Sequence, residues 1–191
     1  MKLVQSTLPG VVIVEPVAFG DDRGWFMETF NEPRWLAGLA ELGLPAPRRF
    51  VQDNHSCSKA GVLRGLHYQL PPQPQGKLVR VVQGAAWDVA VDIRSGSPTF
   101  GRWFGAELSE DNRRQMWIPP GFAHGFCVTS ELADFAYKCT TAYVGKGARA
   151  IAWNDPDLGI DWPTAQPLLS PQDSTAPRLR DATLLPEHPG A

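Results

Sequence analysis

The stretch GVLRGLHYQLPPQPQGKLVR (residues 61–80) contains side chains suited to acid–base chemistry. His67 can take or give a proton near neutral pH, and the cations Arg64 and Lys77 can each hold an anionic oxygen. A cation next to a histidine favours the neutral ring by repulsion, and a general base requires a neutral ring. The alternative is that His67 is a structural residue on a strand, as lone histidines often are.

Whether these side chains can act together depends on how the local backbone orients them. Arg64 and His67 are three residues apart, so a regular strand would place them on opposite faces. Gly65 permits a bulge that would bring both side chains inward. Lys77 follows a Pro-rich turn and begins the next predicted strand, so we expect it to come back alongside His67 across a hairpin.

A second histidine stands in WIPPGFAHGF, where PPGFAH (residues 119–124) matches the P-x-G-x-x-H half of the cupin barrel motif. Metal-dependent cupins also carry H-x-H and a glutamate, because the ion needs three or four ligands. The corresponding place here reads His67-Tyr68-Gln69, which is short of ligands, so we expect no metal. We interpret His124 as a hydrogen-bond donor to an anionic oxygen; the alternative is a buried histidine that supports the turn.

The segment DDRGWFMETF (residues 21–30) has two interpretations. It can be an exposed edge strand with an ion pair between Arg23 and Glu28. It can also be a nucleotide contact, with Arg23 on a phosphate and a ring such as Phe26 against a base or sugar. By itself the segment favours the first interpretation.

Two further segments carry polar groups that can bind a ligand. In QDNHSCS the amides of Gln52 and Asn54 can hydrogen-bond a polar molecule, whereas His55 has no visible partner and is expected on the surface. In DFAYKCTTAY, Tyr137 and Tyr143 are core or rim residues by default. A buried Tyr137 hydroxyl would be costly without a partner, so it must bond to the protein or to a ligand.

The composition is that of an ordinary globular protein. Of its residues, 43% are hydrophobic and 20% are charged. A chain of 191 residues is long enough to form one domain with a sizeable core. The net charge of −2 argues against a general nucleic-acid surface, and no apolar run approaches the roughly 20 residues of a membrane span. The N-terminus MKLVQSTLPG does not read as a signal peptide, and three cysteines without CxxC spacing indicate reduced thiols. We therefore expect a cytoplasmic protein.

Alternation with a period of two dominates the chain and predicts an all-β fold. In AAWDVAVDIR the apolar residues Trp87, Val89, Val91 and Ile93 share one face, and the polar or small residues between them share the other. Further short strands follow, separated by Gly, Pro, Asn and Asp. Strands at such regular spacing indicate an antiparallel sandwich or barrel.

One segment is predicted as a helix, and the C-terminal part as an irregular tail. Asn31 can cap the helix, Pro33 lies in its first turn, and apolar residues then recur at helical spacing. After Trp162 the chain is rich in proline, and we expect this part to lie over the barrel surface. We expect a single domain over residues 1–191, with a tail that is mobile from about residue 174.

Taken in order, these segments resemble the dTDP-4-dehydrorhamnose 3,5-epimerase family. The motifs that carry the resemblance run from about Gly10 to Asp173 and are D-x-R-G-x-F-x-E-x-F, Q-x-N-x-S-x-S-x-x-G-V-L-R-G-L-H-Y-Q, K-L-V-R-V, D-I-R-x-x-S-P-T-F-G, I-P-P-G-F-A-H-G-F, Y-K-C-T and W-N-D-P-x-L-G-I-D-W-P. The resemblance implies a cupin-type jelly-roll barrel of antiparallel strands with a few short helices. It also implies a homodimer, without metal or cofactor, that acts on a dTDP-4-keto-6-deoxy sugar.

The resemblance further implies roles for individual side chains. His67 would be the general base, and Asp173 in LSPQD would align it. Lys77 would face the C4 oxygen, and Tyr137 would donate a proton on the opposite face of the sugar ring, with Tyr143 packed nearby. The residues implied in nucleotide and diphosphate binding are Gln52, Asn54, Arg64 and His124 of the same subunit, and Arg23, Phe26 and Glu28 of its neighbour.

Two positions depart from the family pattern. Ala148 stands where a glutamate is usual, and Gln172 stands where a lysine is usual, so the ligand contacts at both positions are open. Three alternatives also stay open. The first is epimerisation of C3 alone or C5 alone for an antibiotic sugar. The second is a metal-dependent cupin enzyme, which would need a further ligand beside His67 and His124. The third is a cupin that binds sugar nucleotides without catalysis.

Overall fold

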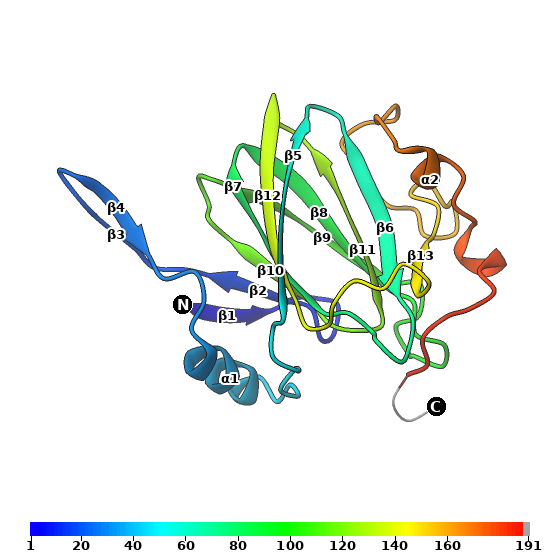
Figure 1. The fold of residues 1–191 in the computed structure, drawn as a ribbon, viewed down its shortest axis with the longest axis horizontal. Helices are drawn as coiled ribbons and strands as arrows, with labels where there is room; N and C mark the ends of the chain where they lie inside the picture. The colour runs from blue at the N-terminus through cyan, green and yellow to red at the C-terminus, as the bar shows by residue number, and fades with distance from the viewer. Residues whose placement is uncertain (189–191) are drawn as a thin grey trace.

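A computed structural model, which describes residues 1–188, shows a jelly roll of two antiparallel sheets that face each other (Figure 1). The six-stranded sheet consists, in spatial order, of β1 (Lys2–Gln5), β2 (Val12–Glu15), β10 (Gln115–Ile118), β7 (Lys77–Gln83), β12 (Leu132–Cys139) and β5 (Gln52–Lys59). The five-stranded sheet consists of β13 (Ala148–Ala150), β6 (Leu63–Gln69), β11 (Phe122–Val128), β8 (Ala85–Asp92) and β9 (Trp103–Ser109). The predicted all-β class is confirmed.

Strand β8 illustrates how alternation with a period of two builds this fold. Its even-numbered Ala86 and Ala90 pack into the core between the two sheets. Its odd-numbered Val89 and Val91 pack into a second core on the outer face of the five-stranded sheet. The larger apolar residues therefore face an outer layer, while the small ones, together with Asp88, face the barrel interior.

The C-terminal part of the chain supplies that outer layer, as its composition predicted. Leu179, in the 3₁₀ helix η1 (Leu179–Asp181), is buried in the outer core. Ser95 forms a bridge with Glu187, which attaches the tail to the loop after β8. The predicted mobility of the tail from about residue 174 stays a prediction, and its last residues, 189–191, lie outside the described residues.

Strand β6 contains the bulge that the sequence predicted. Its register with β11 pairs His67 with His124 and Arg64 with Phe126, so three steps along β6 match two steps along β11. Arg64 and His67 therefore share the inward face. Gly65 has a φ of +135°, and a Cβ added there would lie 2.5 Å from the backbone of β11, so only glycine fits without strain.

The hairpin expected between β6 and β7 does not form, and this prediction was wrong. β6 lies in the five-stranded sheet and β7 in the six-stranded sheet, because the Pro-rich connection between them crosses from one sheet to the other. Lys77 begins β7 on the face that carries Val79 and Val81 into the inner core. Lys77 therefore approaches His67 from the opposite sheet.

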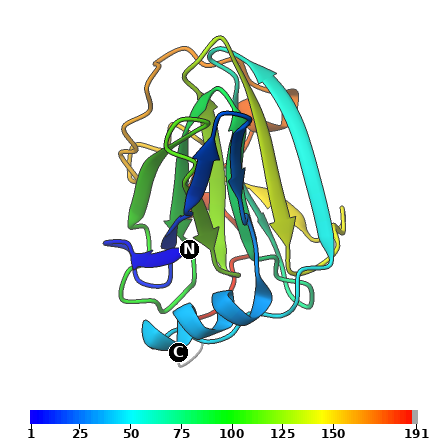
Figure 2. The same ribbon diagram turned by 90° about the vertical axis from the view of Figure 1, so that its left-hand side faces the viewer.

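Helix α1 (Glu32–Glu41) covers part of the outer face of the six-stranded sheet. The side chain of Asn31 accepts a hydrogen bond from the backbone N–H of Arg34 (3.2 Å), which is the predicted N-cap. Trp35 and Leu39 are the buried residues of the helix and pack in a small core beneath the sheet. Figures 1 and 2 both show the helix below the barrel.

Strands β3 (Ala18–Asp21) and β4 (Gly24–Met27) form a separate hairpin. It extends away from the barrel in Figure 1 and points toward the viewer in Figure 2. Three aromatic side chains on it are largely exposed: Phe19 by 67%, Trp25 by 58% and Phe26 by 71%. The guanidinium of Arg113 lies over the Trp25 ring, 4.5 Å from its centroid. Large apolar rings in such a position form a surface suited to another molecule.

Candidate active site

Four of the predicted site residues line one cavity of about 220 Å³ between the two sheets. His67 reaches it from β6 of the five-stranded sheet, and Lys77 and Tyr137 reach it from β7 and β12 of the six-stranded sheet. Tyr143, in the loop after β12, completes this group. The cavity therefore gathers an imidazole, an ammonium and two phenols from elements that are far apart in the sequence.

The imidazole of His67 is held by a carboxylate. Its Nε2 lies 2.5 Å from Oδ1 of Asp173, in the short helix α2 (Pro171–Ser174), and Asp173 is only 3% exposed. A carboxylate accepts, so Nε2 carries the hydrogen and Nδ1 keeps the free lone pair. Nδ1 has no hydrogen-bond partner within residues 1–188. It is the nitrogen with which His67 can take a proton from a ligand.

The carboxylate of Asp173 is itself fixed by Ser170, which caps α2. The Ser170 hydroxyl accepts from the backbone N–H of Asp173 (3.1 Å) and donates to its Oδ2 (2.8 Å). Burial alone would raise the pKa of Asp173, but hydrogen bonds from His67, Ser170 and the backbone of Gly65 outweigh it and lower the pKa. Sequence reasoning missed Ser170, although S-P-Q-D has the spacing of a helix-capping motif.

Lys77 brings the cation to the cavity. It pairs in register with Cys139 of β12, and burial lowers the pKa of its ammonium, while Cys139 and Asp88 act in the opposite direction. In the part of the chain that the structure describes, the ammonium forms no hydrogen bond or ion pair. It is therefore available to bind an oxygen of a ligand.

Tyr137 faces inward from β12, in register with Asn54 of β5 and Val79 of β7. Burial and Cys139 raise the pKa of its hydroxyl, and Arg64 lowers it in part. The phenol therefore keeps its proton at neutral pH, as a proton donor must. The hydroxyl bonds to none of the described residues. The hydrogen-bond partner that a buried hydroxyl requires can therefore come from a ligand.

His124 is buried, with 6% exposure, and its Nε2 lies 2.9 Å from Oδ2 of Asp88. Its ring stacks on Phe135, with the centroids 6.1 Å apart. Burial lowers the pKa of His124; Asp88 opposes this effect, whereas Lys77 and His67 add to it. The expected contact with an anionic oxygen stays a prediction. Asp88 was not identified from the sequence. The feature that could have identified it is an acidic residue at a strand position that faces the barrel interior, where charged residues are rare.

The remaining polar residues predicted on the same subunit face inward near Tyr137. Nε2 of Gln52 donates to Oδ1 of Asn54 (3.0 Å), and Oε1 of Gln52 accepts from the backbone N–H of Tyr143 (2.9 Å). Nε of Arg64 donates to the hydroxyl of Ser58 (3.1 Å). None of these three predicted residues lines the cavity itself, but Gln52 is bonded to Tyr143, which does. The amide pair and the guanidinium can hydrogen-bond the part of a polar ligand that extends beyond the cavity.

The residues predicted on the β3–β4 hairpin and beyond it are not brought to this cavity by their own chain. Arg23 pairs with Asp21 at the hairpin tip, and Glu28 pairs with Arg34 of α1 (3.0 Å). The predicted ion pair between Arg23 and Glu28 is therefore wrong, because each has a nearer partner. Phe26 lies exposed on the projecting hairpin.

The two positions that depart from the family pattern both line the cavity. Ala148 begins β13, and Gln172 lies in α2 directly before Asp173. Neither carries a charge, so the cavity has no acid at the first position and no cation at the second. Arg149, next to Ala148, lines the cavity as well and donates to the backbone carbonyl of Lys146 (2.8 Å).

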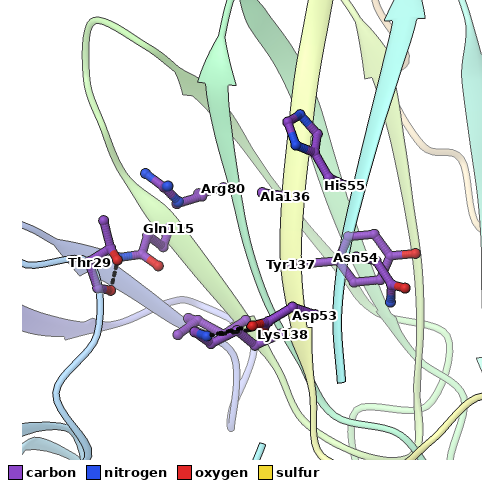
Figure 3. Close-up of a pocket in the computed structure, with 10 residues that line it drawn as sticks. Thr29, Asp53, Asn54, His55, Arg80, Gln115, Ala136, Tyr137 and Lys138 are labelled. Atoms are coloured by element: carbon purple, nitrogen blue, oxygen red, sulfur yellow. Dashed lines mark hydrogen bonds and ion pairs between the residues drawn. The ribbon is translucent and has the colours of Figure 1, made fainter. Parts of the chain in front are cut away.

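A second hollow, of about 330 Å³, lies on the outer face of the six-stranded sheet (Figure 3). Nζ of Lys138 lies 3.0 Å from Oδ1 of Asp53, and Nε2 of Gln115 donates to the backbone carbonyl of Thr29 (2.8 Å). His55 lies at this hollow with 59% of its side chain exposed, in agreement with the predicted surface position. Two polar side chains at this hollow, Lys138 and Gln115, are thus already bonded within the protein, unlike the ammonium of Lys77 and the hydroxyl of Tyr137 at the inner cavity.

The described residues give three further findings. No three His, Cys, Asp or Glu side chains among them are grouped as they would be to hold a metal ion. None of the helices in that range is long and apolar enough to cross a membrane. Cys57 is exposed, Cys127 and Cys139 are buried, and all three are free thiols.

The fold is a cupin-type jelly roll, and its cavity collects the groups of an enzyme that moves protons on and off its substrate. Comparison with known proteins identifies the family within this class. The sequence model of the dTDP-4-dehydrorhamnose 3,5-epimerase family matches residues 5–181, so the chain belongs to this family. By that membership it is an isomerase, an epimerase of dTDP-linked sugars.

Individual relatives support the assignment to this family. A dTDP-4-dehydrorhamnose 3,5-epimerase of Shigella flexneri is 52% identical over 182 residues, which is 95% of this chain and 98% of the relative. The structure of a 3,5-epimerase from Legionella pneumophila, in complex with dTDP-4-keto-L-rhamnose, has a TM-score of 0.90 at 52% identity and covers 98% of both chains. A dTDP-4-dehydrorhamnose 3-epimerase of Streptomyces niveus is 39% identical over 191 residues, covering 98% of this chain and 90% of the relative.

Proposed function

We propose that this epimerase inverts C3 and C5 of a dTDP-4-keto-6-deoxyhexose, as a step of dTDP-rhamnose or related deoxysugar biosynthesis. One group removes the proton from the carbon next to the C4 ketone, and a second group supplies a different proton to that carbon from the opposite face of the ring. The observation that carries this proposal is that His67, Lys77 and Tyr137 line one cavity from two opposed sheets, with His67 held by Asp173.

His67 is the base in this proposal. Its Nε2 is engaged by Asp173 at 2.5 Å, which leaves Nδ1 to take the carbon-bound proton. The carboxylate both orients the ring and stabilises the imidazolium that forms. Ser170 and the backbone of Gly65 hold the carboxylate in place, so the pair does not depend on flexible surface groups.

Lys77 stabilises the enolate. A C–H next to a ketone is a far weaker acid than an imidazolium, and each pKa unit of mismatch costs about 1.4 kcal/mol. The negative charge therefore has to be stabilised where it forms, on the C4 oxygen. The Lys77 ammonium is partly buried at the cavity and has no partner in residues 1–188, so it can meet that charge.

Tyr137 donates its own hydroxyl proton to the carbon. It stands on β12 of the six-stranded sheet, whereas His67 stands on β6 of the five-stranded sheet, so a ring between them has one group on each face. The raised pKa of the Tyr137 hydroxyl keeps it protonated until the enolate requires it. After the first inversion His67 holds a proton and Tyr137 has lost one. Once His67 has released its proton to solvent and Tyr137 has regained one, the same base and acid can serve the second carbon after the ring turns over, with Tyr143 packed near the ring.

Inversion at both carbons is favoured over inversion at one. The Shigella flexneri and Legionella pneumophila proteins, which are named as 3,5-epimerases, are each 52% identical to this chain, whereas the Streptomyces niveus protein, named as a 3-epimerase, is 39% identical. The catalytic side chains do not distinguish the two outcomes, since both need one base and one acid.

The nucleotide and diphosphate are held by polar groups around the cavity. We assign this role to Gln52, Asn54, Arg64 and His124 of the same subunit. The remaining contacts come from a second copy of the chain, so the enzyme acts as a homodimer. The support for this is the projecting β3–β4 hairpin, whose Phe26 is 71% exposed and whose Arg23, paired with Asp21 at the tip, lies on the surface and not at the cavity of its own chain.

The chemistry needs no metal or cofactor in this proposal. The Nε2 atoms of both inward-facing histidines are already bonded to carboxylates, His67 to Asp173 and His124 to Asp88. We also assign the enzyme to the cytoplasm, without nucleic-acid or membrane partners, and three free thiols support a reducing compartment.

Incubation with dTDP-4-keto-6-deoxyglucose in deuterated water tests the proposal. NMR of the product should locate deuterium at both C3 and C5. Deuterium at only one of these carbons would replace the proposal with a single-site epimerase, and a sugar that never takes up deuterium would overturn it. Elemental analysis of the active protein should find no stoichiometric metal.

A further inference from the structure

Asp88 is a fully buried carboxylate that the chemistry above does not use. It stands on the inward face of β8, with 0% exposure, and its Oδ2 lies 2.9 Å from Nε2 of His124. Its other oxygen, Oδ1, has no hydrogen-bond partner within residues 1–188. A buried carboxylate with an unpaired oxygen is costly unless a positive charge lies near enough to compensate.

Lys77 is the cation that can compensate. It enters the same interior from the opposite sheet, with Cys139 of β12 as its neighbour in register. Burial lowers the pKa of Lys77, and Cys139 and Asp88 are the groups that raise it. The ammonium and the free Oδ1 thus each lack a direct partner and lie in the same low-dielectric interior.

His124 is bonded to Asp88 and lies within electrostatic reach of Lys77. Nε2 of its ring donates to the Asp88 carboxylate, so Nδ1 is the nitrogen that remains for another partner. The groups that act on the pKa of His124 are Asp88 on β8, Lys77 on β7 and His67 on β6. Removal of Asp88 would therefore change both the orientation of this ring and the charge balance around Lys77.

We propose that Asp88 is a positioning residue of the active site: it holds His124 through Nε2 and supplies the buried negative charge that keeps Lys77 a cation. This rests on the proposed function for its catalytic consequence, because only a charged Lys77 can stabilise the enolate. The charge relationship itself belongs to the free enzyme and can be measured without substrate.

The test compares Asp88→Asn with Asp92→Asn. Asp92 stands on the same face of β8 and is equally buried, but its carboxylate bonds to Arg94, Ser97 and Thr99, away from the cavity. Lysines carrying ¹³C-methyl groups are titrated by NMR, and Lys77→Met assigns the Lys77 signal. In Asp88→Asn the Lys77 signal should titrate about one pH unit lower or more, whereas Asp92→Asn should leave it unchanged.

The sign of the catalytic effect follows from this shift. Lys77 must be charged, so kcat falls as the pH rises through its pKa, and a lower pKa moves this alkaline limb to lower pH. A folded Asp88→Asn protein whose Lys77 titrates as in the wild type would overturn the proposal. If Asp88→Asn does not fold, the double variant Asp88→Asn with His124→Gln, which places two amides against each other, is titrated in its place and should show the same shift. An NMR shift without deuterium uptake into the sugar would instead reject only the proposed function.

Discussion

The carboxylate of Asp173 lies 2.5 Å from Nε2 of His67, although 106 residues separate them in the chain. Asp173→Asn should therefore fold but lose kcat by about 10²-fold or more, because an amide neither fixes the donor tautomer of His67 nor stabilises the imidazolium. The rate of deuterium uptake by the keto sugar measures this. Asp157→Asn, on an exposed carboxylate, is the control and should keep the wild-type rate. Equal rates in the two variants would contradict the role of Asp173.

Ser170 should affect the pH dependence through Asp173. Hydrogen bonds lower the pKa of Asp173, so the ionised pair is present above that pKa and is lost as the pH falls through it. Ser170→Ala removes one of these bonds, so the acid limb of the kcat profile should move to higher pH. Loss of the helix cap should also cost about 1 kcal/mol of stability. Ser174→Ala, which removes a bond to the carbonyl of Pro171, should leave the acid limb in place.

Loss of the base and loss of the acid should have different effects on deuterium uptake and on inversion. His67→Ala should abolish deuterium uptake, because no other group is placed to take the proton. Tyr137→Phe should lose inversion while keeping some exchange at the first carbon, since proton removal by His67 is still available. Tyr68→Phe is the matched control, because its hydroxyl bonds to the carbonyl of Leu184 on the outer face. Near-normal turnover in both His67→Ala and Tyr137→Phe would refute the assigned roles.

Complementation between subunits tests the contribution of the β3–β4 hairpin. His67→Ala and the double variant Arg23→Ala with Phe26→Ala should each be nearly inactive alone. Mixed under conditions of subunit exchange, they should regain about a quarter of the wild-type rate, because half of the dimers contain one site with an intact base and an intact hairpin. Failure to regain activity, with mixed dimers present, would show that the hairpin does not serve the neighbouring site.

Gly65 should be among the least replaceable residues of the barrel. Gly65→Ala places a Cβ 2.5 Å from Cα of Gly125 at a φ of +135°, so we expect a loss of about 3 kcal/mol or more. Gly61→Ala also has a positive φ, +73°, but meets nothing within 4 Å and should cost about 1 kcal/mol. Denaturant unfolding of both variants measures the difference. Similar losses would mean that the close contact between β6 and β11 relaxes easily.

The sequence alone determined the features that depend on neighbouring residues. Alternation along β8 set which residues share a face, Asn31 set the start of α1, and Gly65 set the bulge that turns Arg64 inward with His67. These follow from backbone geometry over a few residues, which local side chains dictate. The family motifs added the identity of the expected base, acid and cation.

Only the tertiary structure decided which distant groups meet. Lys77 faces His67 from the opposite sheet and not across a hairpin, because the Pro-rich connection changes sheets. Asp88 pairs with His124, and Ser170 secures Asp173, through contacts that no local pattern specifies. Such contacts depend on how two whole sheets and a tail pack on one another, and packing is a property of the complete chain.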